Sequence, residues 1–222
     1  MAINLSDTNY VLNINADCMI EKDSIIKLLL TNQKYKDCFI SSPTFYEKNN
    51  KLAHNSAVFL EKKITPQWNE QSYDGDVCVD WVLGSAILID KKIMQEIGMF
   101  DENLFLYFPD QDICKRASLK KKSIIQVSKA KAIHAHGISK VNNMFKRIFI
   151  RNYNFTFDEL YYLHKIKIHQ NAFNSIRKKI KNYYIKFFLN FLLFRLDKAT
   201  FYIAKILAFK KFKKFLNKKN SL

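Results

Sequence analysis

The sequence predicts an α/β domain followed by a basic helical extension, and three observations support this prediction. Short β-prone apolar runs alternate with segments of helical periodicity. Hydrophobic residues make up 48% of the 222 residues, enough for a buried core and too many for a disordered chain. The net charge of +17 divides into +1 over residues 1–140 and +16 over residues 141–222. We therefore expect a balanced domain over 1–140 and a helical basic extension over 141–222.

The first part of the chain predicts strand–loop–helix units. Strands are expected at residues 10–15 and 38–42, and a helix is expected over the apolar residues 24–30 with Asp23 as its N-terminal cap. Asp17 falls in the loop between the first strand and this helix. Residues 43–76 are polar and carry few signals for either structure.

The second half of the domain continues the alternation. Further strands are expected at 85–89, 123–127 and 132–136, and helices at 91–97 and 110–122. Gly98 is expected to cap the first of these helices. In the second helix, acidic residues near the beginning and lysines near the end suit the helix dipole.

The extension after residue 140 is rich in Phe, Tyr, Leu, Ile and Lys at helical spacing. Residues 208–216 place Ala, Phe and Leu on one side of a helix and four lysines on the other. Such a helix predicts binding to an anionic membrane surface through the C-terminal tail. The most apolar stretch, 183–194, is interrupted by Lys186 and Asn190, so we do not expect it to span a membrane.

Cysteine spacing and the first residues bear on location. The four cysteines form no Cys-x-x-Cys pair, which argues against a zinc site or a disulfide framework. Residues 1–7 lack the basic and apolar regions of a secretory signal. We expect a cytoplasmic protein that lies on the inner face of the cell membrane.

One acidic motif lies at the end of the first predicted strand. Asn15-Ala16-Asp17 follows apolar residues, and ligands of open α/β sheets bind beyond the ends of such strands. A carboxylate at this place suits a divalent cation. A loop aspartate that only caps a turn would give the same pattern.

A second, longer motif lies downstream. It contains Gly98-x-Phe100-Asp101-Glu102 and then Phe105-Leu106-Tyr107-Phe108-Pro109-Asp110-Gln111-Asp112. With Asp17 upstream, it resembles the catalytic region of family 2 inverting glycosyltransferases. The resemblance implies a GT-A (Rossmann-like) fold with a mixed sheet and Asp110 as the catalytic base. Pro109 stands where the family prefers Glu. A simple helix cap is the alternative for Asp110.

The same resemblance assigns further site residues. It implies Asn15 and Asp17 as donor-binding residues, and Trp81, Gly84 and Asp112 as the acceptor side. Trp81 would stack on a sugar ring or fill the core, and Gly84 would allow close approach or only a turn. The resemblance also implies a metal site, Mg or Mn, held by Asp17 with His134 or His136.

The resemblance further implies transfer from a nucleotide-diphosphate sugar to a lipid-linked or surface-polysaccharide acceptor. Phe149-Ile150-Arg151-Asn152 is similar to rhamnosyltransferase-like members, so rhamnose is the sugar expected first. The family's N-terminal nucleotide-binding portion should precede Met1. A catalytically inactive fragment, or the partner subunit of a split transferase with a separately encoded N-terminal half, is the alternative.

Nucleic-acid binding is a further alternative because the pI is about 9.6. The basic residues are concentrated in a Phe-rich amphipathic tail, and no nucleic-acid-binding motif is recognised. We therefore expect no nucleic-acid partner.

Overall fold

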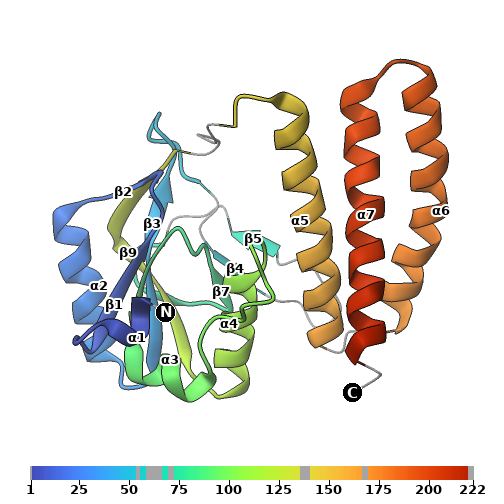
Figure 1. Cartoon of the computed structure of the whole chain (residues 1–222). Helices are drawn as coiled ribbons and strands as arrows, with labels where there is room; N and C mark the ends of the chain where they lie inside the picture. The colour runs from blue at the N-terminus through green and yellow to red at the C-terminus, as the bar shows by residue number, and fades with distance from the viewer. Residues whose placement is uncertain are drawn as a thin grey trace. The chain divides into compact units, whose positions relative to one another are not determined.

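The computed structural model describes residues 2–53, 56–58, 67–69, 73–135, 141–166 and 170–219. The chain, drawn in Figure 1, divides into two compact units. A sheet unit comprises Met1–Phe100 and Asp110–Ile138, and a helical unit comprises Asp101–Pro109 and Ser139–Leu222. The short segment Asp101–Pro109 thus belongs to the helical unit, which the charge distribution along the sequence did not indicate.

The sheet unit is built on a six-stranded mixed sheet, which confirms the predicted fold class. Its strands are β1 (Tyr10–Ile14), β2 (Cys18–Ile20), β3 (Cys38–Tyr46), β6 (Val77–Cys78), β8 (Ala86–Asp90) and β9 (Ser123–His134). They follow the order β1-β8-β3-β9-β2, and β6 also pairs with β9. Only β3 and β9 pair in parallel.

Helices cover both faces of this sheet. They are α2 (Lys22–Lys34), α3 (Lys91–Ile97) and α4 (Pro109–Leu119), and a short α1 (Ala2–Leu5) precedes them. In β8, Ile87 and Ile89 belong to one hydrophobic core with residues of α3 and α4, while Leu88 belongs to a second core with Leu28 of α2. Successive strand residues point to opposite faces, so one apolar strand supplies both cores.

A small antiparallel sheet occupies the region that the sequence left without clear structure. It contains β4 (Ser56–Val58), β5 (Gln67–Asn69) and β7 (Trp81–Val82) in the order β5-β4-β7. Strands of two or three residues have too little periodicity to be recognised from sequence.

Two element predictions are corrected. Helix α2 begins at Lys22 after Glu21, so Asp23 lies inside its first turn and is not the cap. Residues 123–127 and 132–136 were expected as two strands, but 123–134 form the single strand β9. Its long parallel partner β3 continues beside it, with Thr44 opposite Lys131 after a register shift. The intervening lysines therefore interrupt the apolar pattern without ending the strand.

The helical unit contains α5 (Met144–Lys165), α6 (Gln170–Leu192) and α7 (Leu196–Lys219). Helix α7 packs against both other helices. Its Phe212 is fully buried, with its ring 6.2 Å from that of Phe157 in α5, and Phe215 contacts Tyr161. The apolar side of 208–216, expected to face lipid, therefore faces α5. Among the described helices none is long and apolar enough to cross a membrane.

Candidate active site

The site begins where β1 ends beside β8. Ile14 lies opposite Ala86 in this antiparallel pair, so Asn15 and Ser85 extend the pairing by one residue. The Asn15 N–H donates to the Ser85 carbonyl at 2.8 Å, and the Asn15 side-chain amide donates to the Ser85 hydroxyl at 3.4 Å. Asn15, predicted as a donor-binding residue, is thus held against the residue after Gly84.

Asp17 and His134 meet because β2 pairs with the end of β9. Cys18 lies opposite His134, and the Ala135 N–H donates to the Asp17 carbonyl at 2.9 Å. The His134 Nε2 lies 3.4 Å from Asp17 Oδ1, and about a third of the Asp17 side chain is exposed. The structure therefore brings together two predicted metal ligands that are 117 positions apart in the sequence.

These two side chains suit a divalent cation. A carboxylate oxygen and an imidazole nitrogen form a mixed donor set, which favours Mn over Mg. Among the described residues no group of three or more His, Cys, Asp or Glu side chains gathers as a metal site. The remaining ligands of such a cation would have to be water molecules or the phosphate oxygens of a bound ligand, as is usual for cations that bind phosphates. His136, the alternative ligand, lies outside the described residues.

Ser85 is a site residue that sequence reasoning missed. Its hydroxyl lies 3.4 Å from both ring nitrogens of His134 and also accepts from Asn15. A hydroxyl beside an imidazole orients the ring, and in metal sites such contacts outside the ligand shell affect metal affinity. The only signal in the sequence was its place after Gly84.

Gly84 and Asp110 are in direct contact. The Gly84 N–H donates to Asp110 Oδ2 at 3.1 Å, and the Gly84 carbonyl accepts from the Asn13 side chain at 3.0 Å. A Cβ added at Gly84 would lie 3.2 Å from the Asp110 Cβ, closer than side chains normally approach. Gly84 therefore allows close approach of Asp110, and the next residue, Ser85, contacts Asn15 and His134.

Asp110 lies in the first turn of α4, after Pro109 as its first residue. A proline at this place is favourable for a helix, so Pro109 suits the start of α4. Burial raises the pKa of Asp110, although N–H groups of Gly84 and Gln111 favour its charged form. A half-buried carboxylate with a raised pKa is a stronger base than an exposed one.

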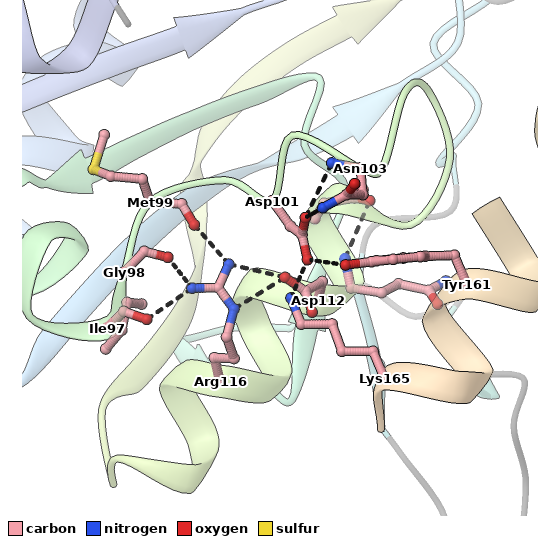
Figure 2. Close-up of polar contacts among 11 residues, drawn as sticks. Ile97, Gly98, Met99, Asp101, Asn103, Asp112, Arg116, Tyr161 and Lys165 are labelled. Atoms are coloured by element: carbon pink, nitrogen blue, oxygen red, sulfur yellow. Dashed lines mark hydrogen bonds and ion pairs between the residues drawn. The ribbon is translucent and has the colours of Figure 1, made fainter. Parts of the chain in front are cut away.

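Asp112, predicted on the acceptor side, has a structural role instead. Only 1% of its side chain is exposed, and its Oδ2 forms an ion pair with Arg116 at 2.9 Å. The same guanidinium donates to the carbonyls of Ile97 and Met99 at 2.7 Å, and also to that of Gly98 (Figure 2). Asp112 and Arg116 thus hold the end of α3, and Asp112 has no surface available to an acceptor.

Trp81 is also buried. It is 2% exposed and belongs to the core that includes Ile87 and Ile113. Of the two alternatives left open by the sequence, the structure favours core packing. Stacking of a sugar on this indole would require the core to open.

Within the helical unit, two carboxylates, one partly and one fully buried, contact the segment that precedes Asp110. Asp101 Oδ2 accepts from Lys165 at 2.7 Å and from the Tyr161 hydroxyl at 3.0 Å (Figure 2). Fully buried Asp158 accepts from the backbone N–H groups of Phe105, Leu106 and Tyr107 at 3.3, 2.9 and 2.8 Å. Sequence reasoning did not identify Asp158, whose only signal is a carboxylate within an aromatic helix.

The chain is similar in sequence to a known glycosyltransferase. No protein-family model matches the chain. It is 25% identical over 141 residues to the rhamnosyltransferase WbbL of Escherichia coli K12, covering 58% of this chain and 53% of that protein. The chain thus spans about half the length of this curated relative.

Two solved structures are also similar. A crystal structure of GalNAc-T7 with UDP, GalNAc and Mn²⁺ has a TM-score of 0.50 at 9% identity, covering 72% of this chain and 36% of that one. A crystal structure of A197 from STIV has a TM-score of 0.41 at 14% identity, covering 61% and 62% of the two chains. The first of these shows that the chain has a fold like that of GT-A glycosyltransferases.

Proposed function

We propose that this chain transfers a sugar from a nucleotide-diphosphate donor to a glycan or glycolipid acceptor, with inversion at the anomeric carbon. The observation that supports the proposal is a chain of contacts: Asp110 accepts from the Gly84 N–H, and the next residue, Ser85, contacts His134, which lies 3.4 Å from Asp17. The similarity to the rhamnosyltransferase supports rhamnose as the first sugar to test.

Asp110 is the proposed base. It would accept the proton of the acceptor hydroxyl while that oxygen attacks the anomeric carbon from the face opposite the nucleotide. Its raised pKa makes it a better proton acceptor. The Gly84 N–H donates to one carboxylate oxygen and the Gln111 N–H to the other, and a second lone pair on each oxygen would be left for the acceptor hydroxyl.

The donor end of the site is proposed around Asp17. Asp17 and His134 would hold the divalent cation, Asn15 would lie beside the donor, and Ser85 would orient the imidazole. When bound, the cation neutralises the charge that develops on the leaving diphosphate.

Thermal unfolding of the full chain with dTDP-, UDP- and GDP-sugars, each with and without Mn²⁺, tests the donor site. We expect Mn²⁺-dependent stabilisation by one nucleotide, lost in Asp17→Asn and kept in Asp110→Asn. Transfer to an acceptor should be lost in both variants. Stabilisation that is the same in Asp17→Asn and the parent would overturn the assignment of the donor end.

A further inference from the structure

The turn between α6 and α7 carries an unusual exposed phenylalanine. Phe194 has φ of +54° and is 87% exposed. The Arg195 N–H bonds to the Asn190 carbonyl and the Phe194 N–H to the Phe191 carbonyl. This is the hydrogen-bond pattern of a Schellman helix end, in which glycine is the usual residue at the left-handed position. Phenylalanine there costs stability and contributes little packing.

The residues around Phe194 are apolar and exposed as well. Leu192 and Leu193 are 71% and 61% exposed, and the neighbouring exposed side chains of α6 and α7 are Ile185, Phe188, Leu189, Phe191 and Leu196. We call residues 185–196 the hairpin tip. Soluble proteins rarely expose so many adjoining large apolar side chains unless something binds them.

Basic residues accompany the hairpin tip. Lys186, Arg195 and Lys198 are exposed within or beside it. Helices α5 and α7 run in the same direction, since Phe157 contacts Phe212 and Tyr161 contacts Phe215. The start of α5, with exposed Phe145, Lys146 and Arg147, therefore lies toward the same end of the helical unit (Figure 1).

We propose that the hairpin tip docks into the interface of an anionic lipid bilayer, with Leu193 and Phe194 inserted and the surrounding Lys and Arg residues at the headgroups. Apolar side chains bordered by basic ones suit such a surface, which attracts each nearby cation. A second copy of the chain fits less well, because residues 141–222 carry a net charge of +16 and would repel an identical surface. This inference does not rest on the proposed sugar transfer.

The assignment differs from the one expected from sequence. Helix α5 covers the apolar side of 208–216. The lipid contact proposed here therefore lies at the other end of α7, where that helix begins.

Binding of the full chain to phosphatidylcholine vesicles with and without phosphatidylglycerol tests the proposal. We expect binding only with phosphatidylglycerol, weakened at least about tenfold by Phe194→Gly and by Leu193→Ser because each removes a large inserted side chain. Lys198→Gln, which removes one charge, should weaken binding roughly fivefold. Leu119→Ser is the matched control. Leu119 is 73% exposed and followed by three lysines, but it lies in α4, and its loss should leave binding unchanged.

Phe194→Gly separates binding from folding. Glycine suits the left-handed position, so this variant should raise Tm by about 2–4 °C while it weakens vesicle binding. In a Phe194→Trp variant, indole emission should shift to the blue on vesicles and be quenched by brominated lipid. Equal vesicle binding by the parent, Phe194→Gly and Leu193→Ser would overturn the proposal. A parent dimer that these variants convert to monomer without lipid would also overturn it.

Discussion

Asp101 and Asp110 lie nine positions apart in one segment, yet the helical unit and the sheet unit treat their carboxylates in opposite ways. Burial alone would raise the pKa of Asp101, but hydrogen bonds from Lys165, Asn103 and Tyr161 outweigh it and hold the pKa well below its usual range. Burial raises the pKa of Asp110, where the partners are neutral backbone amides. A cation beside a carboxylate makes it a structural anchor, whereas a partly buried site with neutral donors leaves the carboxylate able to take a proton.

Removal of the Asp110 charge is expected to have the largest effect on sugar transfer. Asp110→Asn should lower the rate of sugar transfer by about 10²–10⁴-fold, because the amide cannot accept the acceptor proton. The amide oxygen still accepts from the Gly84 N–H, so the fold should be as stable as the parent at pH 7 or more stable. Initial rates and thermal unfolding check both parts. A variant that retains transfer would rule out Asp110 as the base.

A methyl group at residue 84 displaces the base without changing its charge. Gly84→Ala should reduce transfer by about tenfold, since a shift of a few tenths of an ångström at Asp110 disturbs the alignment of the reacting groups. Stability should fall by about 1 kcal/mol from local overpacking. Ala86→Gly, in the same strand region, controls for general loosening, and an equal loss of transfer in both variants would contradict the specific role of Gly84.

Loss of a buried anchor should loosen the segment that leads into Asp110. Asp158→Asn has one acceptor oxygen where the parent has two, so at least one N–H among Phe105, Leu106 and Tyr107 loses its partner. We expect a loss of about 2 kcal/mol in the free energy of unfolding. Denaturant unfolding measures it. Hydrogen exchange should speed up at these three amides, and unchanged exchange there would argue against the anchoring role.

The dependence of stability on pH distinguishes Asp101 from Asp110, because their pKa values shift in opposite directions. Because its folded pKa is lowered, Asp101 contributes stability above the unfolded value of 3.8 that is lost as the pH falls through the folded pKa. Asp110 has a raised pKa, so its contribution to stability is present below 3.8 and lost as the pH rises through the folded pKa. Stability of Asp101→Asn should therefore approach that of the parent in acid.

The same sign argument applies to the proposed reaction. The base is active when it is deprotonated, so transfer should rise with pH through a midpoint above 3.8. The pH profile of kcat/KM measures this midpoint. A midpoint at or below 3.8 would show that burial does not tune Asp110.

The sequence predicted the apolar strands β1, β3 and β8 because each shows a local pattern, and it did not predict the short strands β4 to β7. The strand at 10–15, the helix at 91–97 and the mixed α/β class need only apolar runs and turn residues. The position of Asp17 after a strand likewise follows from chain order. A local pattern cannot identify the hydrogen-bond partner of each acidic side chain, since the partners come from distant elements.

The segment from Gly98 to Asp112 illustrates this limit. It contains four acidic residues, and the sequence assigned two of them to catalysis or acceptor binding. Arg116 lies one helical turn after Asp112, and this spacing favours an ion pair. The structural role of Asp112 could therefore have been predicted from the sequence. Lys165 and Asp158 lie more than fifty positions away from their partners, and no spacing rule reaches them.

The assignment of residues 101–109 to the helical unit has a consequence for separability. The polypeptide leaves the sheet unit after Phe100, joins the helical unit, and returns at Asp110 before it leaves again at residue 139. A gene cut at residue 140 would therefore not release two modules, because the piece kept with the sheet would lose Asp158, Tyr161 and Lys165. Deletion or exchange of the helical extension would therefore also remove the hydrogen-bond partners in α5 of Asp101 and of residues 105–107.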